Sequence, residues 1–338
     1  MAQETTLLSP RFYTIDFAKL DRVSVESVRE DRDILIARTK ADPNRKRFKK
    51  TADWDPVDFE ALEPELRKEL TDFPMSSLTA EFSRCVLCKE MNRRSKNKDI
   101  CELFTYMSRD KARHAGFVND ALKEAGVDVN FFLMKFNKYT CLKPRFIYYA
   151  TYISDKISYA RYIITYRHLE VHPAKRFHPI FKRFKEWRND EFSHGEAFAL
   201  LVRADDKCLK GMNKLWIRFF LIAVFCTMRV RDHARPAFHD ALAVDIDYYD
   251  REATEMTSEI SRQAFPIELN LDERFWNGCR VFAHINLAMA DARAQGGVIG
   301  RLRLIGPGAR AGAVFASLRA RSVKPNALPA SPRLEPVR

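Results

Sequence analysis

Residues 189–194 read Asn189-Asp190-Glu191-Phe192-Ser193-His194 and place a carboxylate and an imidazole three positions apart. On a helix, side chains with this spacing lie on one face and point the same way. Four-helix bundles that bind two metal ions use Glu-x-x-His on each of two helices and a single Glu on each of the other two. The stretch therefore predicts a helix that directs metal ligands into the interior of a helical bundle.

A second stretch has nearly the same pattern, with one important difference. It reads Asp110-Lys111-Ala112-Arg113-His114, so the aspartate and the histidine recur but lysine stands where the pattern has glutamate. Two further carboxylates precede the two stretches: Glu81 lies 30 residues before Lys111, and Asp155 lies 36 residues before Glu191. Such separations suit two helical hairpins, and four helices are predicted to meet at these side chains.

Ionisable side chains interrupt four helix faces that are otherwise mostly apolar or aromatic. A buried charge without a partner costs several kcal/mol, so these groups must satisfy one another or bind something. The four faces, each with residues three or four positions apart, are Leu78, Glu81, Cys85 and Cys88; Phe104, Met107, Lys111, His114 and Val118; Tyr152, Asp155, Tyr159, Tyr162 and Tyr166; and Phe184, Trp187, Glu191, His194 and Phe198.

The composition agrees with a helical protein. Only 11 of the 338 residues are glycine, and 6 of these lie in the last 47 residues. Neither the P-loop pattern nor the dinucleotide-binding Gly-x-Gly-x-x-Gly pattern occurs before that tail, which argues against the nucleotide-binding folds. The odd number of cysteines, seven, suits a reducing compartment better than a disulfide framework.

Positive charge is concentrated in two places. The chain carries a formal net charge of +13, and residues 292–338 contain nine basic residues against one acidic residue. A second cluster, residues 45–50, has five cations in six positions. Such patches attract nucleic acid or an acidic membrane surface. No sequence motif of a nucleic-acid-binding family accompanies them.

Over residues 7–270 the sequence resembles the aerobic magnesium-protoporphyrin IX monomethyl ester oxidative cyclases. The resemblance implies a ferritin-like diiron carboxylate oxygenase of chlorophyll and bacteriochlorophyll biosynthesis. Such an enzyme uses O2 and electrons ultimately from NADPH to close the isocyclic ring of divinyl protochlorophyllide. The stretches that carry the resemblance are residues 7–14, 79–82, 107–121, 146–162, 176–181, 189–200, 213–220 and 230–233.

The resemblance also implies which residues hold two iron ions. Asp155 stands where the family usually has glutamate, and a shorter acid can still coordinate. Asp110 and Asp190, which directly precede Lys111 and Glu191, are expected to orient the ligand histidines from behind. The predicted catalytic and metal-binding residues are Glu81, His114, Asp155, Glu191 and His194.

Lys111 stands where the family usually has a bridging glutamate. A protonated ammonium cannot ligate iron, and its charge opposes two cations nearby. We expect Lys111 to form a buried ion network with the carboxylates if the metal is absent. This leaves two alternatives to the oxygenase: a catalytically impaired paralogue that binds porphyrin or assists assembly, and a ferritin-like electron-transfer or iron-handling protein.

The sequence therefore predicts an all-α protein, a ferritin-like four-helix bundle with additional N- and C-terminal helices. We expect four parts: a polar segment of helices and loops (1–75), the diiron bundle (76–232), a helical extension (233–291) and a basic, weakly ordered tail (292–338).

The expected partners are magnesium-protoporphyrin IX monomethyl ester, an electron-donor protein and an accessory cyclase subunit, without nucleic acid. Nothing at the N-terminus has the pattern of a signal peptide. The longest apolar run, residues 219–226, is shorter than the about 20 residues that span a bilayer. Because the substrate that the resemblance implies is made at membranes, we expect the basic clusters to hold the protein peripherally on the cytoplasmic side of a membrane.

Overall fold

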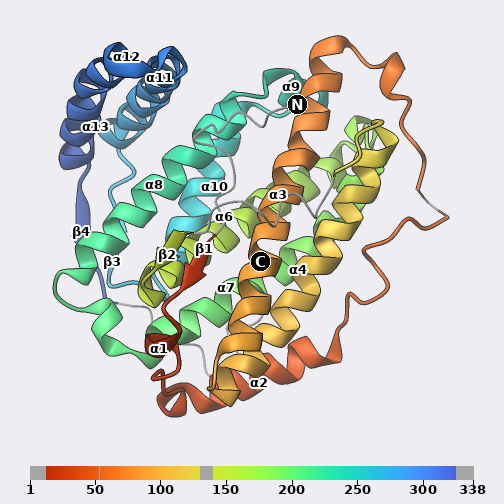
Figure 1. The fold of residues 1–338 in the computed structure, drawn as a ribbon. Coiled ribbons are helices and arrows are strands. Elements are labelled where there is room, and N and C mark those ends of the chain that lie inside the picture. Colours follow the sequence, from red (N-terminus) through yellow and green to blue (C-terminus); the bar gives the residue numbers. More distant parts are fainter. Residues whose placement is uncertain (1–12, 53, 130–139, 325–338) are drawn as a thin grey trace.

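The structure, a computed structural model, describes residues 13–52, 54–129 and 140–324. Within these ranges the chain is almost entirely helical, and the few strands are three residues long (Figure 1). The predicted all-α class is confirmed. Residues 7–12 of the resembling stretches and residues 325–338 of the basic tail lie outside the described residues.

Four long helices form the central bundle as two hairpins, α3 with α4 and α6 with α7 (Figure 1). The local sequence explains where they begin. Pro64 and Pro144 occupy the first turns of α3 and α6, where a missing backbone N–H costs nothing. The Asn97 side chain accepts from the backbone N–H groups of Asp99 and Ile100 and so caps α4. The four helices are α3 (Pro64–Arg94), α4 (Lys98–Glu124), α6 (Pro144–Val171) and α7 (Phe184–Ala204).

Helix α7 is the most enclosed of the four. Every residue from 191 to 202 is buried, so the helix has no solvent-facing side over three turns. A helix that is covered all round lies in the core of its domain. Glu191 and His194 therefore lie in the interior of the bundle, where unpaired polar atoms are costly.

Further elements cover the two hairpins. On the N-terminal side these are β1 (Tyr13–Ile15), α1 (Phe17–Leu20) and α2 (Arg29–Ala41), with β1 paired in parallel to β2 (Thr140–Leu142). On the C-terminal side α8 (Asn213–His233), α9 (Pro236–Leu242) and α10 (Ile246–Ser261) cover the bundle. Short 3₁₀ turns lie at Glu26–Val28, Phe59–Ala61, Pro173–Lys175, Pro179–Arg183 and Asp206–Leu209.

The last helices stand beside α8 at one corner of the molecule (Figure 1). They are α11 (Glu273–Gln295), α12 (Gly297–Arg303) and α13 (Ile305–Ser317), and the strands β3 (Ile267–Leu269) and β4 (Ala320–Ser322) pair antiparallel. The tail was expected to be weakly ordered, and up to residue 322 the structure differs. Alanines, the best helix formers, occupy four positions of α13. Leu318 is buried against Gly278, which ties the tail to α11.

None of the helices in the described ranges is both long enough and apolar enough to cross a membrane.

Candidate metal centre

The bundle brings the predicted ligands to one level of its interior. Glu81 comes from α3, Lys111 and His114 from α4, Asp155 from α6, and Glu191 and His194 from α7. All six side chains are buried. The helical hairpins inferred from the spacing are thus found, and the four helices meet at these side chains.

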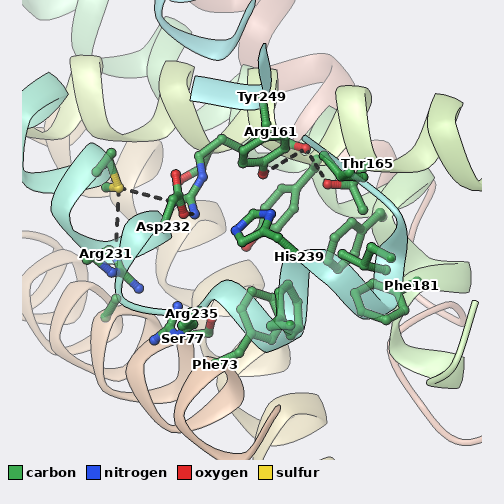
Figure 2. Close-up of a pocket in the computed structure, with 18 of the residues that line it drawn as sticks. Phe73, Ser77, Arg161, Thr165, Phe181, Arg231, Asp232, Arg235, His239 and Tyr249 are labelled. Carbon is green, nitrogen blue, oxygen red and sulfur yellow. Dashed lines mark hydrogen bonds and ion pairs between the residues drawn. The ribbon is translucent and has the colours of Figure 1, made fainter. Parts of the chain in front are cut away.

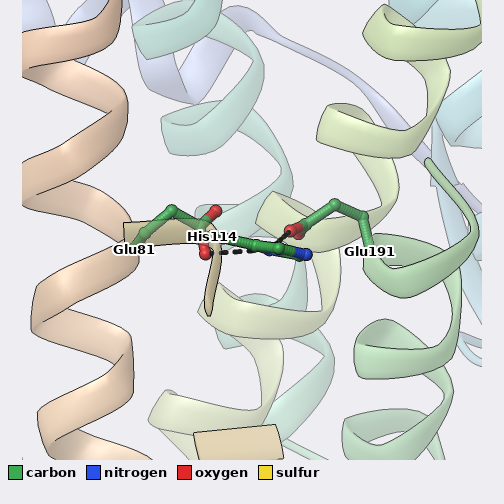
Figure 3. A group of neighbouring side chains, drawn as sticks. All are labelled: Glu81, His114 and Glu191. Atoms are coloured by element: carbon green, nitrogen blue, oxygen red, sulfur yellow. Dashed lines mark ion pairs between the residues drawn. The ribbon is translucent and has the colours of Figure 1, made fainter. Parts of the chain in front are cut away.

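Three of the side chains form a set that suits a metal ion. Glu81, His114 and Glu191 each offer one ligand atom, and these atoms lie within 4.8 Å of one another. His114 Nδ1 is 3.4 Å from Glu81 Oε2 and 3.7 Å from Glu191 Oε1. Figure 3 shows the two carboxylates approaching the imidazole from opposite sides. Neither His114 Nδ1 nor Glu81 Oε2 has a hydrogen-bond partner, so a bound cation would satisfy atoms that are buried without a hydrogen bond.

Each of the two aspartates faces the histidine of the other helix, Asp190 of α7 that of α4 and Asp110 of α4 that of α7. Asp190 Oδ2 lies 2.9 Å from His114 Nε2, and Asn44 Nδ2 donates to the other oxygen of Asp190 at 2.6 Å. A carboxylate in this place fixes the ring orientation and leaves Nδ1 free for a metal. Asp110 Oδ2 is farther from its histidine, 3.6 Å from His194 Nε2.

His194 and Asp155 lie beside the three-residue set rather than within it. The Nδ1 atom of His194 is 3.9 Å from Glu191 Oε1, and neither ring nitrogen of His194 has a hydrogen-bond partner. Asp155 forms an ion pair with Arg84 of α3. Burial raises the pKa of Asp155 to about 6, although the positive charges of Arg84 and Lys111 act in the opposite direction.

Lys111 occupies the centre of the carboxylates. Its Nζ lies 2.6 Å from Glu191 Oε1, 3.4 Å from Glu81 Oε2 and 3.8 Å from Asp155 Oδ1. The expected ion network is therefore present. Burial alone would lower the pKa of this ammonium, but the three carboxylates outweigh burial and raise it.

Arg84 is a member of the cluster that the sequence patterns did not identify. Its guanidinium pairs with Asp155 and lies 3.7 Å from Glu191 Oε2. The signal was available, because Arg84 follows Glu81 by three positions and shares its helix face. With Lys111 it places two cations among three carboxylates.

Glu81, His114 and Glu191 could hold one metal ion, at the carboxylate oxygens that Lys111 contacts in the metal-free protein, and the described residues offer no set for a second ion. An ion at Glu81, His114 and Glu191 would meet two carboxylates and an imidazole, the donors that iron and zinc sites use. A second ion beside it would need the space and the charge balance that Lys111 and Arg84 take.

Aromatic rings close the centre against water. The ring centroids of Phe48 and Trp187 lie 4.5 Å and 5.1 Å from that of His114. Tyr162 packs on Trp187 at 5.1 Å. Phe48 lies within the basic cluster at residues 45–50. Its ring covers the centre while the five cations of the cluster are exposed, and Lys50 pairs with Glu124 of α4.

A cavity adjoins the centre on the side of α8 and α9. It holds about 870 Å³ of empty space, including the part open to solvent, and Glu81 and Arg84 form part of its wall. Figure 2 shows Arg161, Arg231 and Arg235 around it, with Phe73 and Phe181 on its apolar side. The sequence patterns included Glu81, Tyr162 and Phe184 of this wall but did not bring them together with α8 and α9, which reach α3 only in the folded chain.

Comparison with known proteins agrees with this architecture. Residues 72–202, which contain nearly all of the bundle, match the rubrerythrin family model. The chain is 45% identical to the aerobic magnesium-protoporphyrin IX monomethyl ester oxidative cyclase of Rubrivivax gelatinosus, over 99% of this chain and 95% of the relative. It is 41% identical to the magnesium-protoporphyrin IX monomethyl ester oxidative cyclase of Synechococcus sp. strain RCC307, over 86% and 82% of the two chains. The protein of the same name from Gloeobacter violaceus is also 41% identical, over 84% and 83%. No solved structure matches the chain. The chain belongs to the magnesium-protoporphyrin IX monomethyl ester oxidative cyclase family.

Proposed function

We propose that this protein is an oxidative cyclase that converts magnesium-protoporphyrin IX monomethyl ester to divinyl protochlorophyllide by closing the isocyclic ring. The observation that carries the proposal is the 45% identity to a protein of that name over nearly the whole of both chains. The buried set of Glu81, His114 and Glu191 supplies a place for the metal that such an oxidation needs. The relatives compared all carry the cyclase name, and this does not favour a porphyrin-binding or assembly protein without catalytic activity.

The proposed cofactor is iron, with O2 as oxidant and electrons ultimately from NADPH through a donor protein. Iron bound at Glu81, His114 and Glu191 would supply the one-electron and O2 chemistry that amino acid side chains lack. Asp190 orients His114 for this role, and Phe48 and Trp187 exclude water from the imidazole. The resemblance implies two iron ions, whereas the residues offer a ligand set for one.

Peripheral contact with an anionic membrane surface is a further part of the proposal. Helix α12 exposes Val298, Ile299 and Leu302, with exposed fractions of 73%, 66% and 61%. Arg301 and Arg303 lie on the same short helix. Apolar side chains flanked by cations are typical of segments that rest in the interface of an acidic bilayer. The accessory subunit and the four-part division of the chain stay predictions.

The direct test is ring closure by the purified full chain. The chain is reconstituted with Fe²⁺ under nitrogen and given magnesium-protoporphyrin IX monomethyl ester, O2 and an NADPH-dependent reductase system. Formation of divinyl protochlorophyllide is followed by absorbance and chromatography. We expect product with the native chain and a loss of at least 100-fold for Glu191→Gln, because that substitution weakens the metal ligand set.

A matched control separates this loss from a general effect of removing a carboxylate. Glu255→Gln alters an exposed glutamate of α10 and is expected to leave ring closure unchanged. If the native chain takes up no iron and forms no product, while Lys111→Glu does both, this protein is not a cyclase and the non-catalytic alternative replaces the proposal.

A further inference from the structure

The cavity beside the metal centre contains more positive than negative charge. Four arginines line it: Arg84, Arg161, Arg231 and Arg235. Two of these have carboxylate partners, because Arg84 pairs with Asp155 and Arg161 pairs with Asp232. The charges of Arg84 and Arg161 are therefore neutralised by these carboxylates. Arg231 and Arg235 leave the cavity with a net positive charge, which attracts anions.

Arg231 and Arg235 have only neutral acceptors. Their guanidinium groups donate to Ser76 Oγ at 2.9 Å and 2.8 Å, and Arg235 also donates to the backbone carbonyl of Asp72 at 3.1 Å. Among the described residues no carboxylate lies within ion-pair distance of either group. Arg231 Nε has no hydrogen-bond partner at all.

Such an arrangement is costly in the unliganded protein. Arg235 is 9% exposed, and a buried charge without a counter-ion loses its hydration without replacing it. Burial lowers the pKa of Arg231, and the nearby charges of Arg161 and Arg235 lower it further. A bound anion would remove this penalty, as it does in other sites where cationic side chains converge on a cavity.

Part of the remaining wall is aromatic. Phe73 and Phe238 stack with ring centroids 5.0 Å apart, and Phe181 and Phe184 are in contact at 5.2 Å. All four line the cavity. The cavity therefore combines aromatic surface with two unneutralised guanidinium groups, which suits an apolar ring system that carries a carboxylate.

The two arginines border the same cavity as Glu81 of the metal centre. Both bond to Ser76, which precedes Glu81 by five residues on α3. With a rise of 1.5 Å per residue, Ser76 and Glu81 are separated by about 7.5 Å along the helix axis. A ligand held by the arginines would thus lie in the cavity that Glu81 also borders.

We propose that Arg231 and Arg235 bind the free carboxylate of the tetrapyrrole substrate, the propionate that is not esterified. This inference rests on the proposed function, because it takes its ligand from there. Protoporphyrin IX carries two propionates on neighbouring pyrroles, and in the monomethyl ester one of them remains ionised. With that carboxylate on the arginines, the esterified propionate faces the metal centre, so the pair selects which side chain is oxidised.

The test compares two probes on the intact full chain. Magnesium-protoporphyrin IX monomethyl ester has one carboxylate, and the dimethyl ester has none. Binding is measured by quenching of tryptophan fluorescence. We expect the native chain to prefer the monomethyl ester by roughly 10- to 100-fold, the effect of charge-assisted hydrogen bonds. The double variant Arg231→Gln/Arg235→Gln is expected to bind both esters equally. Arg310→Gln, on the exposed surface of α13, is the matched control and keeps the preference.

The outcomes separate this inference from the proposed function. If the native chain binds both esters equally but still closes the ring, the arginine pair has no such role and the function stands. If the double variant retains the preference, the inference is wrong. If the native chain neither binds nor converts the monomethyl ester, both fail. The comparison of the two esters on the native chain needs no variant, so a double variant that does not fold leaves the test intact.

Discussion

Lys111 offers the sharpest test of how this metal centre is built. Its ammonium lies 2.6–3.8 Å from three buried carboxylates. Lys111→Met removes the charge at similar length, and Lys111→Glu replaces it with the carboxylate that the family usually has. Lys111→Met leaves three carboxylates beside the single guanidinium of Arg84. Lys111→Glu leaves four carboxylates beside it.

The expected loss in the free energy of unfolding follows from the loss of a buried ion pair. Removing one partner of such a pair costs about 3–5 kcal/mol, because the remaining charge stays buried without compensation. Since Lys111 serves three carboxylates, we expect the upper end of this range for Lys111→Met in the metal-free protein. A metal ion at about 100 times its dissociation constant would return about 2.7 kcal/mol. Excess metal should therefore restore much of the lost stability.

The assay has two measurements on the same samples. Denaturant unfolding with and without excess Fe²⁺ under nitrogen gives the free energy of unfolding, and elemental analysis after gel filtration gives iron per chain. We expect about one ion for the native chain and for Lys111→Met, and about two for Lys111→Glu, in line with a four-carboxylate bundle site. Lys156→Met is the matched control, because Lys156 is buried and pairs with Glu196 at 2.6 Å outside this cluster. It should lose stability with no change in iron content, and iron should stabilise it only as much as it stabilises the native chain.

Two results would refute this account of the centre. A native chain that binds two ions would show that Lys111 and Arg84 do not exclude the second ion. A Lys111→Glu variant that binds no more iron than the native chain would show that the bridging position is not what limits the metal content.

Two further predictions concern the surroundings of the centre. Asp190→Asn should weaken metal affinity roughly 10- to 100-fold by loosening the ligand histidine, measured by competition with a chelator, whereas Asp240→Asn on the surface should not. Gly195→Ala should cost about 1–3 kcal/mol in denaturant unfolding, because its Cβ would lie 2.8 Å from Lys156 Cε. Gly116→Ala, where a Cβ meets nothing within 4 Å, should instead stabilise α4 by up to about 1 kcal/mol, and equal effects at both glycines would contradict the packing explanation.

The spacing of residues along single helices predicted much of this protein. Side chains three or four positions apart share a helix face whatever the helix packs against, so the grouping of Glu191 with His194 and of Lys111 with His114 follows from local geometry. The same period predicted the four helices and the all-α class. The pairing of Asp190 with His114 and of Asp110 with His194 runs between α4 and α7, so it does not follow from spacing along one helix.

Residue spacing along single helices does not predict the contacts between helices. Arg84 pairs with Asp155 across 71 positions, and Arg231 reaches Ser76 across 155. Such contacts depend on how each helix is rotated and shifted against its neighbours, which packing of the whole core determines. The sequence alone therefore determined which ligands face the interior. Only the tertiary structure decided that two cations stand among them and that an arginine-lined cavity opens beside them.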